Sequence, residues 1–353
     1  MIGIRADAND IAATGHIMRC ITIAKQLRAH GKEVLFFLAD EYGISLLEEN
    51  EFSYVVLHTD WENPIEETGI LAKELRMRGI KTVLFDSYRM TREYFTSLRE
   101  QMGQDEAFAY IDDLFEEVYP VDALINYNAY HVQFPYTEAY QKADQERMDG
   151  KMTRLCLGPE YVPLREEFGK SNLQDGSENT VLLSCGGGDV LQSLYGILEK
   201  AVKDSRFSDT FFHVVVGRYH QKKELLEQLA EVYNHVILHH DVRNMAELME
   251  QNCIAVSAAG TRLYELCAME RPTVFFITAD NQRYDSDFFA EDERMYFAGD
   301  IRTDREACLE GILDGVKELL EHPQKRMQMK EKLRMVTDGK GALRIAEVLE
   351  EME

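Results

Sequence analysis

The chain of 353 residues alternates short, continuous apolar runs with longer segments in which apolar residues recur at helical spacing. In the first half, the runs GIRADA, EVLFFLAD, SYVVLH, KTVLFDSY, EAFAYIDD and VDALINYN predict strands, and HIMRCITIAKQLRAHG is a clear helix after the first of them. Strands that are buried on both faces read as continuous apolar runs, and the helices between them form crossovers. The alternation therefore predicts an α/β fold with a parallel, doubly wound sheet.

The second half repeats this alternation. The runs NTVLLSCGGGD, TFFHVVVG, HVILHHD, CIAVSAAG and PTVFFITADNQ predict strands, and a helix-rich tail follows from about Glu306. Between the halves, the stretch from His131 to Lys170 looks irregular and contains Pro135, Pro159 and Pro163. We expect two Rossmann-like domains, 1–160 and 161–353, with a cleft between them and the helical tail in the second.

Composition excludes several classes of protein. The formal net charge of -24 disfavours a nucleic-acid binder, which needs a basic surface. The opening residues do not resemble a signal peptide, and no run of about 18 apolar residues is present, so we expect a cytoplasmic protein without a membrane partner. The six cysteines are scattered without paired spacing, so neither a disulfide framework nor a metal site is expected. The pattern does not indicate an oligomeric state.

Two glycine-containing turns are candidate anion sites. Gly186, Gly187 and Gly188 end a predicted strand just before a helix, and the turn from Ser257 through Ala259 and Gly260 to Thr261 has the same arrangement. Turns of this kind bring backbone N–H groups to an anion at a helix N-terminus. Either turn alone can be only a tight connection, but two of them favour a phosphate or diphosphate ligand.

Three polar residues in the second half are candidate ligands for a sugar or ribose. Glu265 lies on the helix that follows the second turn, where a carboxylate can accept two hydroxyl hydrogen bonds or simply complement the helix dipole. Asn281 and Gln282 follow a buried strand, where they can bind sugar hydroxyls or serve as turn residues.

In the first half, the segment IAATGHIMRC places His16 at the start of a predicted helix, after a strand that Asp7 closes. A carboxylate near an imidazole fixes its tautomer, and a helix N-terminus favours the neutral ring that a general base must have. A histidine at a helix start can also be purely structural. Asp86 and Tyr88 end a later strand and are predicted to face the same cleft, unless FDSY is only a turn.

Several blocks of the chain resemble a known family, in the same order along the sequence. RADANDIAATGHIMRCITIA, FDSY, LGPEYVPLREEF, LLSCGGGD and the block from NMAELMEQN to ITADNQ are similar to the UDP-sugar hydrolases of pseudaminic acid biosynthesis, which are related to spore-coat polysaccharide biosynthesis proteins. The resemblance implies a glycosyltransferase-B (GT-B) type fold. It also implies inverting, metal-independent hydrolysis of UDP-2,4-diacetamido-2,4,6-trideoxy-β-L-altropyranose to the free sugar and UDP, without a cofactor.

The resemblance also implies roles for residues of this chain. His16 matches the base that takes a proton from the attacking water, and Gly15 keeps the backbone clear of the substrate. Glu265 matches the glutamate that holds the uridine ribose. Asp7, Tyr88, Asn281 and Gln282 match residues that face the sugar or the diphosphate. Asp7 and Tyr88 join His16 as candidate catalytic residues. Asp86 and Arg19 are candidate substrate-binding residues, while Arg5 is assigned no role.

The chain departs from the family pattern at the second turn. The expected sequence has two glycines and a threonine, whereas Ala259 here replaces one glycine and Arg262 adds a further cation. Two other functions remain open. A glycosyltransferase of the same fold would use His16 to activate an acceptor hydroxyl instead of water, and a non-catalytic binding protein would hold the UDP-sugar without a base.

Overall fold

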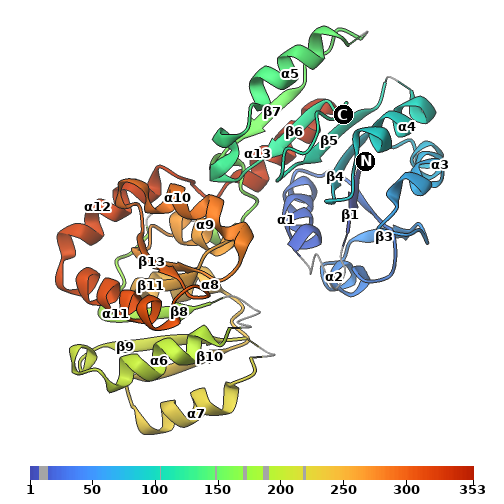
Figure 1. The fold of residues 1–353 in the computed structure, drawn as a ribbon. Helices are drawn as coiled ribbons and strands as arrows, with labels where there is room; N and C mark the ends of the chain where they lie inside the picture. Colours follow the sequence, from blue (N-terminus) through green and yellow to red (C-terminus); the bar gives the residue numbers. More distant parts are fainter. Residues whose placement is uncertain (8–14, 104, 148, 170–172, 186–190, 218–219) are drawn as a thin grey trace. The chain divides into compact units, whose positions relative to one another are not determined.

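The computed structural model describes residues 1–7, 15–103, 105–147, 149–169, 173–185, 191–217 and 220–353 (Figure 1). The chain forms two compact units. The first comprises Met1–Arg165 together with Lys340–Glu353, and the second is the continuous segment Glu166–Gly339. Each unit is an α/β body built on one parallel sheet, which confirms the predicted fold class.

The first unit contains a seven-stranded sheet in the order β3-β2-β1-β4-β5-β6-β7, and all neighbouring strands are parallel. The central strands are fully buried because helices cover both faces of the sheet. The strands are β1 (Ile2–Ala6), β2 (Val34–Leu38), β3 (Ser53–Val56), β4 (Thr82–Asp86), β5 (Ala107–Ile111), β6 (Ala123–Asn126) and β7 (Arg154–Leu157).

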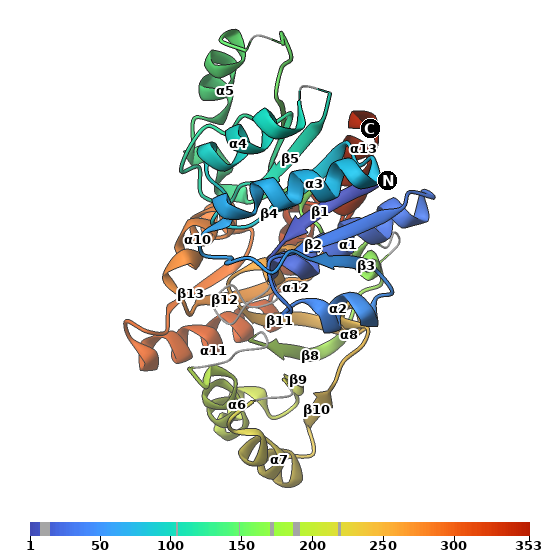
Figure 2. The same ribbon diagram turned by 90° about the vertical axis from the view of Figure 1, so that its right-hand side faces the viewer.

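Helices lie on both faces of this sheet (Figures 1 and 2). Crossovers between parallel strands are right-handed, so helices before and after the reversal of strand order pack on opposite faces. Accordingly, α3 and α4 pack together on one face, and α1 packs with α13 on the other. The helices are α1 (Gly15–Ala29), α2 (Ile44–Glu49), α3 (Thr68–Arg78), α4 (Arg92–Met102), α5 (Tyr136–Gln145) and α13 (Gly341–Met352).

The second unit contains a six-stranded parallel sheet in the order β10-β9-β8-β11-β12-β13. Counted within the unit this is the order 3-2-1-4-5-6 of the classic dinucleotide-binding fold. The strands are β8 (Ser177–Ser184), β9 (Phe211–Val216), β10 (Val236–His240), β11 (Asn252–Ala258), β12 (Thr273–Ile277) and β13 (Tyr296–Asp300). The helices are α6 (Ser193–Lys203), α7 (Lys223–Val232), α8 (Met245–Gln251), α9 (Thr261–Ala268), α10 (Arg283–Ala290), α11 (Arg305–Glu321) and α12 (Pro323–Arg334).

The strand orders identify one special position in each sheet. The order reverses between β1 and β4 in the first unit and between β8 and β11 in the second. Loops that leave the carboxyl ends of two such strands diverge to opposite faces, and the crevice between them is where open α/β sheets bind ligands. In the first unit that position lies between Ala6, the last residue of β1, and its partner Asp86 in β4.

The last helix departs from the domain organisation that the sequence predicted. The expected second domain ran to residue 353, but α13 packs against α1 and β4 of the first unit. Its apolar residues recur at helical spacing and form a buried stripe consisting of Ala342, Ile345, Ala346 and Leu349. A stripe of this kind shows that a helix packs against another element but does not identify that element. The sequence therefore assigned α13 to the second domain, with the helices that precede it in the chain.

The stretch from His131 to Lys170, which was predicted to be irregular, contains regular secondary structure. It contains α5 and the edge strand β7, and the second unit ends its sheet with α10 and β13; the sequence pattern predicted none of these four elements. Both missed strands are short edge strands with partly exposed residues. They therefore lack the continuous apolar run that marks a buried strand.

Gly341 begins α13 at a point where the backbone of the first unit leaves no space. A Cβ atom on this residue would overlap the carbonyl oxygen of Val162 and the neighbouring backbone atoms. We expect Gly341→Ala to lower the free energy of unfolding by about 3 kcal/mol, because backbone atoms cannot move aside as a side chain can. Urea unfolding measures the effect.

Gly69 is the matched control for this substitution. It lies in the first turn of α3, where a Cβ atom would meet, among the described residues, only the flexible Gln101 side chain at 3.4 Å. We expect Gly69→Ala to be neutral or stabilising by about 0.5 kcal/mol, as for other helical glycines. Equal effects of the two substitutions would contradict the packing argument.

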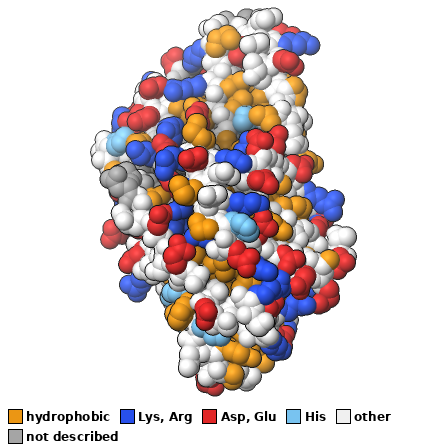
Figure 3. Space-filling model, turned by 90° about the vertical axis from the view of Figure 1, so that its left-hand side faces the viewer, with side chains coloured by type: hydrophobic (Ala, Val, Ile, Leu, Met, Phe, Trp, Pro, Cys, Tyr) orange, Lys and Arg blue, Asp and Glu red, His pale blue; other side chains and the backbone are white. Residues whose placement is uncertain are grey.

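Charged side chains of both signs are interspersed over the face shown in Figure 3. The described residues of that face therefore form no continuous basic surface of the kind that nucleic acid requires. Among the residues that the structure describes, no helix combines the length and the apolar character needed to cross a bilayer.

Candidate functional site

Polar residues gather at the carboxyl edge of the first sheet. Asp7 follows β1, Asp86 ends β4, Asp113 follows β5 and Asn128 follows β6. These four strands are neighbours in the sheet, and their carboxyl ends share one edge because they are parallel. The edge includes the reversal of strand order between β1 and β4, so it is the position at which this fold binds ligands.

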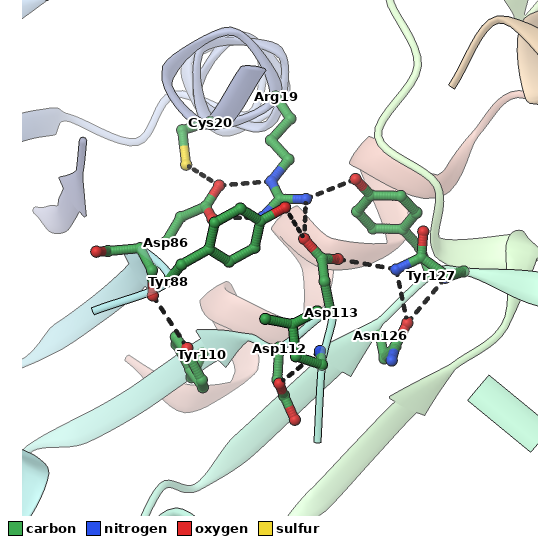
Figure 4. A network of polar contacts seen from close by, with 12 residues as sticks. Arg19, Cys20, Asp86, Tyr88, Tyr110, Asp112, Asp113, Asn126 and Tyr127 are labelled. Atoms are coloured by element: carbon green, nitrogen blue, oxygen red, sulfur yellow. Dashed lines mark hydrogen bonds and ion pairs between the residues drawn. The ribbon is translucent and has the colours of Figure 1, made fainter. Parts of the chain in front are cut away.

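Arg19, in the second turn of α1, joins the carboxylates of two neighbouring strands (Figure 4). Its Nε and Nη2 atoms donate to the two oxygens of Asp86 at 2.6 and 2.5 Å. Its Nη1 atom donates to Asp113 Oδ2 at 2.9 Å and to the hydroxyl of Tyr127 at 2.6 Å. The fork of the guanidinium thus holds Asp86 in a bidentate pair while it also holds Asp113.

The ion pair decides the charge of Asp86. Burial alone would raise the pKa of this carboxyl, but the positive charge of Arg19 outweighs burial and holds the pKa below its usual value. Burial also raises the pKa of the Tyr88 hydroxyl, and the neighbouring charge of Asp113 adds to this rise. Tyr88 is therefore a neutral hydrogen-bond donor, and its hydroxyl donates to Asp113 Oδ2 at 3.2 Å.

Acid should weaken the Arg19–Asp86 pair. The pKa of Asp86 is lower in the folded state than in the unfolded state. The pair therefore contributes its full stabilisation of the fold above the unfolded pKa of about 3.9. This contribution is lost as the pH falls through the pKa of the folded state. We expect Asp86→Asn to cost about 2–3 kcal/mol at neutral pH and progressively less below about pH 4. Urea unfolding of both proteins between pH 7 and pH 3 measures this, and a difference that does not change with pH would contradict it.

His16 is the second residue of α1 and only 4% exposed. Its ring packs edge-on against the ring of Tyr88, with centroids 4.4 Å apart and an interplanar angle of 84°. Within the described part of the chain, its Nδ1 atom is buried without a hydrogen-bond partner. Buried polar atoms nearly always have a partner, and exceptions point to a functional group or a missing ligand.

A second cluster lies around Arg5, the next-to-last residue of β1. Arg5 is completely buried and donates from Nε and Nη2 to the two oxygens of Glu67 at 2.7 and 2.9 Å. Its Nη1 atom donates to Asp7 Oδ1 at 2.5 Å, and the hydroxyl of Tyr94 donates to Glu67 at 2.8 Å. The other oxygen of Asp7, Oδ2, is buried without a partner among the described residues. The cluster therefore fixes Asp7 at the end of β1.

In the second unit, the turn after β11 leads directly into α9. Gly260 has a φ of +124°, a conformation that favours glycine, and it immediately precedes the first helical residue, Thr261. The Ser257 hydroxyl donates to the carbonyl of Ala258 at 2.9 Å. Ala259 is buried, and its N–H donates to the carbonyl of Phe276 in the next strand. The turn therefore places a helix N-terminus at the reversal of strand order in this sheet.

Glu265 and Gln282 lie on elements that follow β11 and β12. Glu265 accepts a hydrogen bond at 2.7 Å from Arg262, one turn earlier on α9. The side-chain carbonyl of Gln282 accepts from the backbone N–H groups of Thr278 and Ala279 at 2.7 and 3.2 Å. Gln282 thus closes the turn after β12, while its amide nitrogen lies 4.0 Å from the position that a Cβ atom on Gly260 would occupy.

Some of the sequence-predicted residues come together in the structure. His16, Arg19, Asp86 and Tyr88 form one cluster in the first unit, and Asp7 is held beside it by Arg5. Gly15 begins α1, and a Cβ atom there would meet no atom of the described residues within 4 Å, so packing against the described part of the chain does not require glycine. Gly186, Gly187 and Gly188 lie outside the described residues, as does the side chain of Asn281.

Other members of the cluster were missed. From the sequence, Asp113, Tyr127 and Asn128 were predicted only as strand ends, and no pattern pointed to Glu67. The signal for the first three was present: they follow buried strands whose carboxyl ends share one edge. In the part of the chain that the structure describes, no group of three or more His, Cys, Asp or Glu side chains is arranged to hold a metal ion.

Comparison of the sequence finds distant relatives. The spore coat polysaccharide biosynthesis protein SpsG of Bacillus subtilis is 21% identical over 99% of this chain and 98% of its own length. The uncharacterized protein MJ1062 of Methanocaldococcus jannaschii is 23% identical over 80% of this chain, but the match spans only 56% of that protein, little more than half its length. No protein-family model matches the chain.

Comparison of the structure identifies the fold. MurG of Acinetobacter baumannii superposes with a TM-score of 0.69 at 13% identity, and the match covers 99% of both chains. UGT2 of Phytolacca americana, solved with UDP-2-fluoro-glucose and pterostilbene, superposes with a TM-score of 0.66 at 12% identity over 99% of both chains. These neighbours are GT-B glycosyltransferases, so the two Rossmann-like units have the GT-B fold that the family resemblance implied.

Proposed function

We propose that this chain is a nucleotide-sugar enzyme that breaks the anomeric C–O bond of a UDP-linked sugar. The observation that carries the proposal is the buried Nδ1 atom of His16, which has no partner among the described residues and lies at the ligand-binding edge of the first sheet. A base without a competing hydrogen-bond partner is ready to accept a proton from a substrate. The spore-coat relative, named for polysaccharide biosynthesis, supports carbohydrate chemistry.

The proposed reaction is inverting hydrolysis. Water attacks the anomeric carbon on the face opposite UDP while His16 takes one of its protons. The new C–O bond forms as the bond to the diphosphate oxygen breaks, and UDP leaves with that electron pair. A diphosphate is a good leaving group without protonation, so the step does not require a carboxylic acid. The substrate class proposed from the sequence is a UDP-linked diacetamido-trideoxy sugar of pseudaminic acid biosynthesis.

The second unit is proposed to bind the UDP part. The N-terminus of α9, approached through Gly260 and Thr261, offers backbone N–H groups to a diphosphate. Glu265 lies one turn further along α9, where its carboxylate can accept hydrogen bonds from both ribose hydroxyls. UGT2, a neighbour in fold, was solved with a UDP-sugar analogue, which supports this assignment.

A glycosyltransferase is the second candidate, and the fold comparison favours it specifically. MurG and UGT2 share the architecture over the full length of the chain. In that reaction an acceptor hydroxyl replaces water, and His16 removes its proton in the same way. The two candidates differ only in the nucleophile.

One assay separates these functions. The full chain is incubated with a panel of UDP-linked diacetamido and other sugars in ¹⁸O-labelled water, and both UDP and sugar products are measured by mass spectrometry. Hydrolysis releases UDP without an acceptor and places ¹⁸O on the anomeric carbon. Release of UDP only when an acceptor is added would instead indicate a transferase, and binding without any release would contradict both.

Glu265 provides a prediction about UDP binding. Glu265→Gln should weaken UDP binding about tenfold, since hydrogen bonds to a charged acceptor contribute roughly 1.5–3 kcal/mol and an amide keeps only part of that energy. Calorimetric titration of the full chain with UDP measures the change. Glu199→Gln is a suitable control because Glu199 lies on α6 and pairs with Lys203. Equal affinities of Glu265→Gln and the unaltered chain would contradict the assignment.

A further inference from the structure

Arg19 occupies the centre of the polar cluster but has little capacity left to bind a substrate. A guanidinium has five N–H donors, and four of them are used by Asp86, Asp113 and Tyr127. Only 10% of the Arg19 side chain is exposed. Two carboxylates also outweigh its single positive charge. An arginine in this situation is a poor ligand for a diphosphate. Its contribution to the site therefore depends on the side chains that it holds in place.

Asp113, one of the groups that Arg19 holds, connects Arg19 to His16 through Tyr88. Asp113 Oδ2, which accepts from Arg19 Nη1, also accepts from the Tyr88 hydroxyl at 3.2 Å. The other oxygen of Asp113 accepts from Asn128 at 2.8 Å, so the carboxylate is fixed on both sides. Figure 4 shows Arg19 and Tyr88 converging on Asp113 from different elements. The ring of Tyr88 in turn contacts the ring of His16.

Tyr88 needs this support because half of its surface is exposed. The residue is 50% exposed and lies in the loop after β4. An edge-on contact between two rings contributes only about 0.5–1.5 kcal/mol, which is too weak to fix an exposed side chain alone. The hydroxyl anchor on Asp113 supplies the second point of attachment. Two points of attachment define the ring orientation, and the ring then limits the orientations of the imidazole.

We propose that Arg19 is a positioning residue, which fixes Asp113 and through it the Tyr88 ring, so that the ring holds the His16 imidazole in its reactive orientation. This inference rests on the proposed function, in which His16 is the base. It differs from the role that the sequence predicted for Arg19, which was direct contact with the substrate. Misplacing a reacting group by about 1 Å can cost a factor of about 10² in rate, so the arrangement has a measurable consequence.

The arrangement is tested first without any substrate. The full chain is labelled with ¹³C-histidine, and the His16 ring signal is identified by its loss in His16→Gln. The nearby Tyr88 ring shifts this signal through its ring current. Tyr88→Phe keeps the ring but loses the anchor, so we expect the His16 signal to move, and we expect Arg19→Gln and Asp113→Ala to move it in the same direction. Arg19→Lys should restore it in part, since one charge and one donor remain.

Kinetics then separate positioning from substrate binding. For Arg19→Gln we expect kcat to fall about 10- to 100-fold with KM changed less than about twofold. Arg99→Gln is the matched control, because Arg99 is likewise partly buried and pairs with Asp122, at the other end of β6. It should leave the His16 signal and kcat unchanged.

The outcomes are distinguishable. A folded Arg19→Gln with an unchanged His16 signal, or with a raised KM and an unchanged kcat, overturns the inference. If Arg19→Gln does not fold, Tyr88→Phe decides, because it removes only one hydroxyl from a half-exposed residue: an unmoved signal overturns the inference and a moved one supports it. Undiminished UDP release by His16→Gln would refute the proposed function instead, while the signal shifts would still test the arrangement.

Discussion

His16→Gln is expected to release UDP from a UDP-sugar about 10²–10⁴ times more slowly than the unaltered chain, the usual contribution of a general base. Glutamine has a similar reach and polarity, but its amide cannot take up a proton at neutral pH. The loss should lie in kcat, because the imidazole acts on the attacking nucleophile and not on the UDP part. UDP release under single-turnover conditions measures it.

Two measurements keep this result interpretable. UDP affinity should be the same in His16→Gln and the unaltered chain, and the urea midpoints should agree closely, because the Nδ1 atom of His16 has no partner to lose within the described residues. His30→Gln is the control substitution, since His30 lies at the end of α1 on the surface and pairs with Glu350. A His16→Gln variant as active as His30→Gln would exclude His16 as the base.

Arg5→Met is expected to cause the largest loss of stability, about 3–5 kcal/mol. Arg5 is completely buried, and its removal leaves the carboxylates of Glu67 and Asp7 without their cation in a site that water does not reach. Methionine fills a similar volume, so the effect is electrostatic and not a cavity. Urea unfolding at pH 7 measures the loss.

Arg206→Met provides the comparison for Arg5→Met. Arg206 also joins several carboxylates, Asp204, Glu310 and Asp314, but these groups are 22–56% exposed. Solvent screens such pairs, so we expect a loss below about 1 kcal/mol. The double variant Arg5→Met with Glu67→Gln should recover part of the stability, because it removes one of the stranded charges. If it were less stable than Arg5→Met alone, uncompensated charge would not be the cause.

The sequence was most informative for features that depend on residues close together in the chain. A buried parallel strand requires a continuous apolar run, and a helix that covers it requires apolar residues at helical spacing, so both sheets and most of their helices could be predicted. His16, Asp86 and Tyr88 were identified for the same reason: they lie at strand or helix ends, which the apolar pattern marks.

The sequence was least informative where the partner is distant. Arg5 and Glu67 are 62 residues apart, and Arg19 and Asp113 are 94 residues apart. No local pattern indicates that such residues meet; only the strand order does, by bringing β1, β4 and β5 side by side. The proposed positioning role of Arg19 depends on these contacts, which a local pattern does not show; the sequence therefore suggested only a substrate ligand, whereas the structure shows Arg19 in an internal ion pair.

The return of α13 to the first unit has a consequence for how the protein is made. The second unit is continuous, so it can fold as soon as residue 339 has left the ribosome, whereas the first unit must wait for α13. At about 5–20 residues per second, the apolar face of α1 that α13 covers stays open for on the order of 15–60 seconds. The half of the chain that is translated first is therefore completed last.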